Sequence, residues 1–115
     1  DKQITIDLVL SIDEINDVLF RTVMRFAPFG LGNKAPVFCT KEINNFKLSL
    51  VGNNDSHLKG VIFGSSKSFE FIGFNLGYKY DCLCKSKAIN VCYTIYEDSW
   101  GGEKKLKLKL IDIKS

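Results

Sequence analysis

The chain has 115 residues, of which 45% are hydrophobic and 25% charged, and its formal net charge is +3. This composition is typical of one globular domain with its own core and excludes a disordered chain. No apolar run approaches the roughly 20 residues of a membrane-spanning helix and no signal peptide is visible, so we expect no membrane partner. Because the sequence begins at Asp1 rather than Met, we expect a piece of a longer protein.

The charge is divided unevenly along the chain. Residues 1–33 hold three basic and five acidic side chains, whereas residues 34–115 hold thirteen basic side chains, all Lys, and eight acidic ones. Lys is a point charge suited to phosphates, and Arg is the usual bidentate reader of guanine. If the later part binds nucleic acid, it should therefore contact mainly the backbone, with little sequence preference. A solvated basic surface would show the same pattern.

The four cysteines indicate neither a zinc site nor a disulfide. The sequence has no CxxC pair and a single His, so the ligand spacing of a zinc site is absent. Cys82 and Cys84 are too close along one extended strand to bridge easily. We interpret all four as reduced thiols of a cytoplasmic protein, with Cys39 and Cys92 filling the core.

The first part of the chain predicts a short strand followed by an amphipathic helix. Apolar residues alternate over residues 4–8, as in a strand. Ser11 and Glu14 have the spacing of a capping box, and apolar residues over 12–26 follow a 3.6-residue period, which predicts a helix of about four turns. Pro28 ends this helix. A strand and one helix cannot bury their own apolar faces, so this part should dock on another surface.

A segment rich in proline and glycine joins the helix to the rest of the chain. It holds both prolines of the sequence and two closely spaced glycines. Pro fixes φ and Gly permits positive φ, so the spacing predicts a rigid, shaped joint. A glycine-rich loop can also cradle phosphate, but no GKS or GKT follows, which favours the structural interpretation. The residues assigned to the joint are Pro28, Phe29, Gly30, Gly32, Asn33 and Pro36.

After the joint the hydrophobic period changes to two, which predicts five strands. The first covers residues 37–50, interrupted at Asn44 and Asn45 and interpreted as one long bent strand. The other strands are predicted at 57–63, 68–74, 89–96 and 106–113, separated by turn residues. The longest interruption, residues 75–87, lies between the third and fourth strands and has room for a short helix.

Five strands with their longest connection at this place are typical of an OB fold, a partly open five-stranded barrel. A β-sandwich would need about seven strands, which the length barely allows. The predicted fold class is therefore mainly β, an OB-fold barrel preceded by a short strand and one helix. We divide the chain into an N-terminal part at 1–33 and the barrel at 34–115.

Four short motifs follow one another along the chain. Residues 28–38 read PFGLGNKAPVF, 57–59 read HLK, 69–74 read FEFIGF, and 100–113 begin with WGG and end with IDI. They resemble, in the same order, the PFGxGNxxPxF, HLK, FDxIxF and WxG…LxL…DI motifs of RecJ, the bacterial single-stranded-DNA-specific exonuclease family. The resemblance covers essentially the whole chain.

The resemblance implies an OB-fold domain that lies beyond the catalytic core of a RecJ-type exonuclease and helps to hold single-stranded DNA. In that family the nuclease chemistry belongs to domains that bind a divalent metal, Mg or Mn, through Asp and His clusters, and this sequence has no such motif. The parent protein is then a hydrolase of DNA repair and recombination, while this chain is not catalytic and holds no cofactor. The implied partners are single-stranded DNA, the parent's catalytic domains or a further protein.

OB folds bind ligands along their second and third strands, between the loops that follow the first and fourth. Single strands are held there by a basic groove and by aromatic rings on which bases stack. The candidate DNA contacts on these elements are His57, Lys59, Phe69, Phe71, Trp100, Lys105, Lys107 and Lys109.

Each candidate also has a structural interpretation. His57 could bond a base or the local backbone, and Phe69 and Phe71 could stack on bases or fill the barrel. Trp100 could be a stacking platform or a plug that closes one end of the barrel. Lys105, Lys107 and Lys109 alternate with leucines and should form an outward row about 6–7 Å apart, matching phosphates or protecting a sheet edge. Lys59 could pair with a phosphate or simply be exposed.

Two functions therefore remain open. The first is a module that binds single-stranded DNA and guides it to a nuclease core elsewhere in the parent protein. The second is a structural module that docks on the parent's catalytic domains or on another protein, because the apolar face of the predicted helix needs a partner surface.

Overall fold

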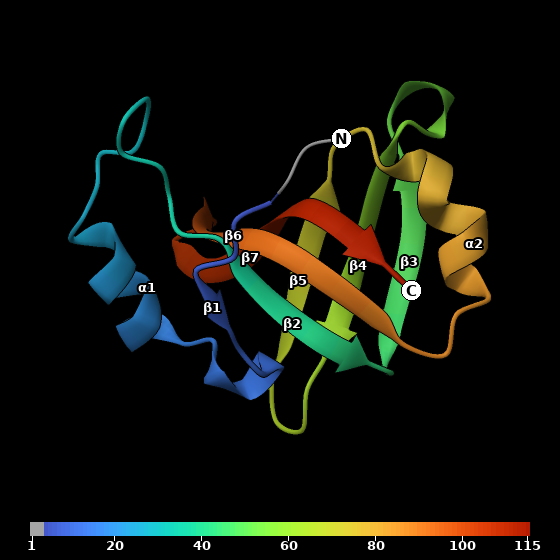
Figure 1. Cartoon of the computed structure of the whole chain (residues 1–115), viewed down its shortest axis with the longest axis horizontal. Helices are drawn as coiled ribbons and strands as arrows, with labels where there is room; N and C mark the ends of the chain where they lie inside the picture. The colour runs from blue at the N-terminus through green and yellow to red at the C-terminus, as the bar shows by residue number, and fades with distance from the viewer. Residues whose placement is uncertain (1–3) are drawn as a thin grey trace.

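The computed structural model describes residues 4–115, which form one strongly curved β-sheet with a short helix on either side (Figure 1). The strands within these residues are β1 (Leu8–Val9), β2 (Phe38–Ile43), β3 (Phe46–Val51), β4 (His57–Phe63), β5 (Ser68–Gly73), β6 (Ile89–Trp100) and β7 (Glu103–Lys114). The helices are α1 (Asp17–Met24) and α2 (Tyr80–Cys84), and single 3-10 turns cover Ile12–Glu14, Asn53–Asp55 and Gly77–Lys79.

The strand pairing is that of an OB-fold barrel, so the predicted fold class is confirmed. β4 pairs antiparallel with β3 and β5, β5 pairs in parallel with β7, and β6 pairs antiparallel with β7 and β2. Only Asn44 and Asn45 separate β2 from β3, yet these two strands pair with different neighbours, so the chain between them closes the barrel. The sheet of residues 4–115 has seven strands instead of five, because this first strand is split and β1 adds to the edge beside β2.

One side of the long strands fills the core. Its largest fully buried side chains are Tyr93, Phe71, Ile15, Leu58, Ile62, Leu83, Ile89, Leu108, Ile113 and Val91. Phe71 on β5 lies opposite Gly60 on β4, where a Cβ atom would collide with the Phe71 ring and with a backbone carbonyl. The missing side chain on β4 therefore makes room for the large ring on β5. The Tyr93 hydroxyl meets Thr40 Oγ1 at 2.8 Å, and burial raises the pKa of Tyr93 to about 12.

The predicted helix over 12–26 is wrong in length. Residues 12–14 form a separate 3-10 turn, where the Ser11 N–H donates to Glu14 Oε1 at 2.8 Å, and α1 begins only at Asp17. Asn16 between them is extended, with φ at −152°, and its side chain caps α1 by accepting the Leu19 N–H at 2.8 Å. This break in the helix turns Ile15 into the barrel core, where its side chain is completely buried.

The surface on which this N-terminal part docks is the barrel itself. Leu10, Ile12 and Ile15 belong to the barrel's hydrophobic core, and β1 pairs in parallel with β2. The Asp13 carboxylate accepts two backbone N–H bonds, at 2.9 and 3.1 Å, from the turn between β4 and β5, and these bonds lower its pKa. On α1, Arg21 pairs with Glu97 of β6 at 2.7 Å. The domain boundary at residue 33 stays a prediction.

The joint between α1 and β2 is held by its own hydrogen bonds. Gly30 and Asn33 exchange backbone hydrogen bonds of 2.8 and 3.1 Å, and Gly32 between them has φ at +83°, which favours glycine. The Asn33 side-chain amide donates to the carbonyls of Phe26 and Pro28 at 2.8 and 2.7 Å. These bonds tie the end of α1 to the loop that follows it.

The connection between β5 and β6 carries α2, at the place where the sequence allows a short helix. Lys79 Nζ, just before α2, donates to Asp112 Oδ1 at 2.7 Å and to the Ile113 carbonyl at 2.8 Å. Burial favours the neutral carboxyl of Asp112, but the bonds from Lys79 and from the Ile113 N–H outweigh it and lower its pKa. The pair anchors this connection to β7.

Among residues 4–115, no helix is both long and apolar enough to cross a membrane.

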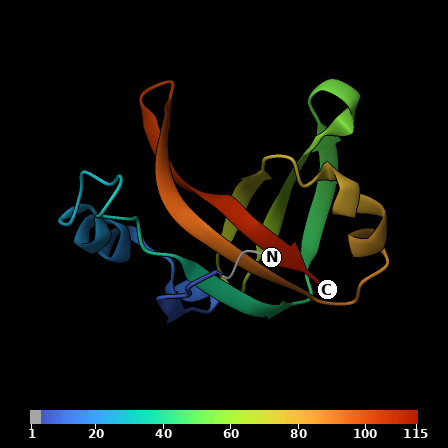
Figure 2. The same cartoon turned by 45° about the horizontal axis from the view of Figure 1, so that its top comes forward.

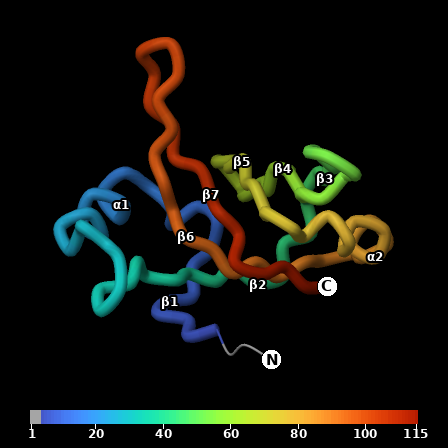
Figure 3. Tube along the Cα trace, turned by 90° about the horizontal axis from the view of Figure 1, so that it is seen from above, coloured from blue at the N-terminus to red at the C-terminus, as the bar shows by residue number. Residues whose placement is uncertain are grey.

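The hairpin of β6 and β7 extends well beyond the barrel (Figures 2 and 3). Each strand has twelve residues. Gly101 and Gly102 form the two-residue turn between Trp100 and Glu103, both with positive φ, as tight hairpin turns require. The turn therefore places Trp100 at the tip of the longest projection of the molecule.

Candidate nucleic-acid interface

The side of β3, β4, β5 and β7 that points away from the core forms a surface that we call the outer face. Strand register places Ser49, Lys59, Ile72 and Lys109 in one row across it, since each is the cross-strand partner of the next. The turn between β3 and β4 and the β6–β7 hairpin border this face. In OB folds the second and third strands, here β4 and β5, bind oligonucleotides together with these two loops.

Two lysines and one aromatic ring of the outer face are positioned to meet a ligand. Lys59 and Lys109 are exposed, and neither forms an ion pair with another residue of the described part, 4–115. Phe74, directly after β5, is 53% exposed, and Lys109 Nζ lies 5.8 Å from the centre of its ring. A base stacked on Phe74 would thus have a cation beside it for the neighbouring phosphate.

Phe74 is absent from the contacts predicted above. The sequence names Phe69 and Phe71, which alternate onto the same side of the strand, as rings that stack on bases or fill the barrel. Period-two alternation puts Phe74 on the opposite side of the strand, together with Glu70 and Ile72. The charged Glu70 on that side is the one sequence signal that Phe74 points toward solvent. The sequence could not show which of the two sides faces the core.

Phe69 and Phe71 face the barrel interior. Phe71 is only 2% exposed, and the half-buried Phe69 packs against the same core. The Phe71 ring could stack on a base only if the barrel opened, and Phe69 has its ring turned to the same interior side. The core interpretation therefore applies to both residues, and we withdraw them from the candidate contacts.

His57 is held in place by the fold. Its Nδ1 accepts the Asn75 N–H at 2.9 Å, and its ring meets Phe74 edge-on with 5.3 Å between ring centres. Gly52 leaves room for the imidazole, since a Cβ atom there would lie 2.6 Å from the ring. These contacts make His57 a support for Phe74, which is its structural interpretation.

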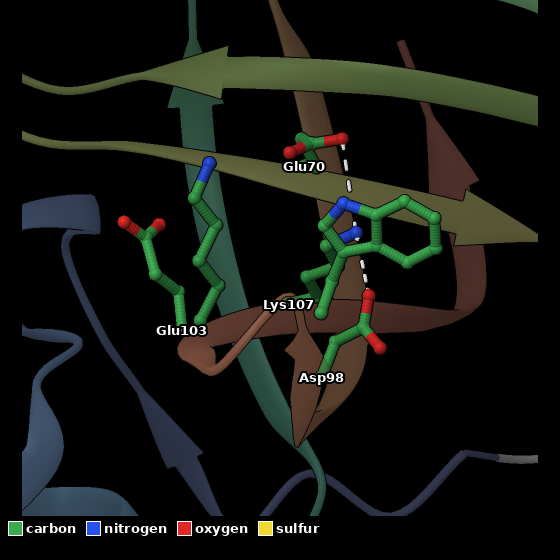
Figure 4. A pocket seen from close by; sticks show the side chains of 6 residues that line it. Glu70, Asp98, Glu103 and Lys107 are labelled. Atoms are coloured by element: carbon green, nitrogen blue, oxygen red, sulfur yellow. Dashed lines mark ion pairs between the residues drawn. The ribbon is translucent and has the colours of Figure 1, made fainter.

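Lys105, Lys107 and Lys109 alternate along β7 and point outward but are not equivalent. Lys107 Nζ lies 2.8 Å from Asp98 Oδ2 and 3.9 Å from Glu70 Oε1, and Figure 4 shows it between these two carboxylates. The hydrogen bond to Asp98 raises the pKa of Lys107. Lys105 and Lys109 are exposed and form no ion pair within residues 4–115. The expected row of phosphate contacts is therefore interrupted at its middle position.

Trp100 does not plug the barrel, because its side chain is 85% exposed near the hairpin tip. It borders a cavity of about 360 Å³ between β5 and the hairpin, which we call the hairpin pocket. The pocket is lined by Glu70, Asp98, Trp100, Glu103, Lys105 and Lys107. Of the two interpretations of Trp100, the exposed platform is the one compatible with this position.

The cysteines lie apart from this interface. Cys39 is buried opposite Cys92 across β2 and β6, and burial, followed by the neighbouring Cys39, raises the pKa of Cys92 to about 11. Cys82 and Cys84 are free thiols exposed on α2, in the connection where the sequence allows a short helix. Within residues 4–115, no three His, Cys, Asp or Glu side chains are grouped so that they could hold a metal ion.

Comparison with known proteins now identifies the family. A family model described as the RecJ OB domain matches residues 6–112. The chain belongs to the RecJ OB-domain family. The resemblance seen in the four sequence motifs is thereby confirmed. No curated protein matches the chain by sequence.

Two crystal structures of RecJ from Thermus thermophilus, one in complex with Mg²⁺ and one with Mn²⁺, share the fold. Their TM-scores are 0.62 and 0.61, and both are 18% identical to this chain over 84% of its length. The chain spans only 14% and 13% of those RecJ chains. The RecJ OB domain is thus a small part of a much longer protein in these relatives.

The RecJ motifs coincide with structural features of this chain. Asn33 of the first motif holds the joint, His57 of the second supports Phe74, and the glycines after Trp100 form the hairpin turn. Phe74 itself closes the third motif. The motif residues named here therefore have structural roles: they hold the joint, support Phe74 and form the hairpin turn.

Proposed function

We propose that this RecJ OB domain binds single-stranded DNA along its outer face and guides it to the catalytic core of a RecJ-type exonuclease. One observation carries the proposal: Phe74 is exposed with Lys109 beside it and Lys59 in the same row, on the strands that OB folds use for oligonucleotides. Exposed rings stack on bases of any sequence, and lysines pair with phosphates. The proposed contacts are Lys59, Phe74, Trp100, Lys105 and Lys109.

The catalytic role is assigned to the rest of the parent protein. The chain matches a small fraction of the RecJ chains, and no catalytic residue is assigned within it. In this proposal the nuclease chemistry, its Mg or Mn ions and the role in DNA repair and recombination belong to the whole protein. The domain contributes affinity and direction to the substrate strand.

Fluorescence anisotropy with a labelled single strand tests this function. The domain should bind weakly at low salt and more weakly at moderate salt, since phosphate contacts release counterions. Duplex DNA should compete poorly, because its bases are not free to stack on the exposed rings. Absence of binding at low salt, or binding that ignores salt, would contradict the proposal.

A second function, docking on the parent's catalytic domains, is favoured by a different surface. An apolar groove of about 390 Å³ lies between α1, the joint and β6, lined among others by Val23, Phe29 and Pro36. Close to it in sequence, Phe26 is 67% exposed and Leu31 completely exposed on the joint. Apolar groups presented in this way are typical of a covered interface.

The two functions can be separated in the full-length parent protein. Replacing Lys59, Trp100 and Lys109 together by Ala should lower exonuclease activity on long single strands if the outer face holds DNA. Replacing Phe26 and Leu31 by Ser should instead weaken the association of the domain with the catalytic part, measured as loss of a single cooperative melting transition. Unchanged activity in the triple variant would favour docking as the sole role.

A further inference from the structure

The hairpin pocket has a chemistry that the rest of the outer face lacks. Three of its six lining side chains are carboxylates, Glu70, Asp98 and Glu103, and two are lysines. Lys107 is already bound between Glu70 and Asp98. The pocket therefore carries a surplus of negative charge at the border of a face whose other exposed groups are mostly cationic. A phosphate group is disfavoured here, while a group that donates hydrogen bonds is favoured.

The carboxylates retain acceptor capacity. Lys107 engages one oxygen of each neighbour, Glu70 Oε1 and Asp98 Oδ2, and leaves Glu70 Oε2 and Asp98 Oδ1 to accept other donors. The side chains of Glu70 and Asp98 are 38% and 43% exposed, so a ligand can reach them. A carboxylate has about four lone-pair positions and commonly accepts two N–H donors at once.

The remaining wall of the pocket is suited to a flat ring. Trp100 borders it from the hairpin tip, and Trp is a strong platform for stacking a base. The volume of about 360 Å³ falls within the roughly 300–1,000 Å³ of small-ligand pockets. A single strand that crosses the row of Lys59 and Lys109 would reach this pocket at the border of the outer face.

We infer that the hairpin pocket receives one nucleobase of the bound strand and prefers guanine. Guanine presents two adjacent N–H donors, on N1 and on its 2-amino group, which match two carboxylate acceptors. Cytosine and adenine present one amino group beside an acceptor nitrogen, and thymine presents one N–H between two carbonyls, which the carboxylates repel. Lys105 can donate to the guanine O6. The inference rests on the proposed function, to which it adds a base preference that lysine contacts to the backbone cannot provide.

The test compares three labelled eight-residue strands with the 115-residue chain. In the first strand thymine alternates with guanine, in the second it alternates with inosine, and the third is all thymine. Whichever way the strand shifts along the protein, the tested base can reach the pocket, and no run of guanines can form. Inosine is guanine without the 2-amino group and isolates that donor. Binding is measured by fluorescence anisotropy at low salt. The guanine strand should bind at least about 5-fold tighter than either other strand, as one good base contact provides.

Two variants assign the preference to the pocket. Glu70→Gln and Asp98→Asn, alone or together, should reduce the ratio of guanine to inosine affinity toward one. Asp81→Asn on α2 removes the same charge outside the pocket and should keep the ratio. The ratio is the readout, because removing any negative charge raises affinity for all three strands. Thermal melting of each variant checks that it is folded.

The outcomes separate this inference from the function on which it rests. Equal, salt-dependent binding of the three strands would refute the guanine preference and leave the single-strand function intact. A guanine preference that persists in the double variant would also refute the inference, because the residues that recognise guanine would then lie outside the pocket. Absence of binding to all three strands would refute the proposed function itself.

Discussion

Removing Lys59 and Lys109, which share one row of the outer face and form no ion pair within residues 4–115, should change the salt dependence of DNA binding by a calculable amount. The variant is Lys59→Ala together with Lys109→Ala. Both side chains are exposed and lie in one row across β4, β5 and β7, so one bound strand can contact both through its phosphates. Neither forms an ion pair within residues 4–115, so their removal should leave the fold intact.

The magnitude follows from counterion release. For single strands, the slope of log affinity against log salt is about −0.7 for each phosphate contact. Losing two contacts should therefore make the slope shallower by about 1.4. Between 50 and 200 mM salt, the double variant should lose about 7-fold less affinity than the unmodified domain loses.

The assay is fluorescence anisotropy across a salt series with one labelled strand. A matched control replaces Lys34, in the joint, and Lys87, before β6, by Ala. This control removes the same net charge from positions outside the outer face and should leave the slope nearly unchanged. Equal changes of slope in the two double variants would show that net charge, and no defined contact, governs binding. An unchanged slope in both double variants would show that Lys59 and Lys109 do not contact the phosphates of the bound strand.

Three further predictions concern other residues. Trp100→Ala should weaken single-strand binding by about 5- to 150-fold, the equivalent of 1–3 kcal/mol of stacking, with no change in melting temperature because the ring is 85% exposed. Gly60→Ala should lower the free energy of unfolding by about 1–3 kcal/mol in urea titrations, because the added Cβ collides with the Lys47 carbonyl and the Phe71 ring; stability equal to the parent would contradict this packing. Asp112→Asn should cost about 1–3 kcal/mol, because it removes the negative charge that faces the Lys79 ammonium. Since the pKa of Asp112 is lowered in the folded state, its contribution is present above about pH 4 and lost as the pH falls further, so the variant should show a flatter loss of stability in acid; identical acid unfolding curves would refute this.

Much of the fold follows from local patterns. The change of hydrophobic period after the joint predicts the strands of the barrel, and the long interruption at 75–87 predicts the connection that carries α2. The helix over 12–26 fails because apolar spacing continues through Asn16, although the backbone there is extended. The side-chain cap on α1 and the burial of Ile15 in the barrel outweigh the helical period.

The sequence predicts which strands form the candidate interface, but only some of the residues that those strands present to a ligand. Lys59, Lys105 and Lys109 were found because alternation with apolar residues marks the outward side of a strand. Lys107 follows the same alternation, yet its ammonium is held by Asp98 from β6 and faces Glu70 from β5. Phe74 is missing from the sequence-based candidates, whereas Phe71, a candidate for stacking or core, is buried; both sides of β5 carry large apolar residues, so alternation alone does not identify the buried side.

Local patterns are enough to predict the mainly β class, the OB barrel and the resemblance to the RecJ family, because periodicity and short motifs depend on residues that are neighbours along the chain. Only the folded chain shows that the N-terminal part packs on the barrel, that Gly60 accommodates Phe71, and that Trp100 lies near the hairpin tip beside a pocket lined by carboxylates. These features join strands far apart in the sequence. Their register depends on how the barrel closes, and no local pattern encodes that closure.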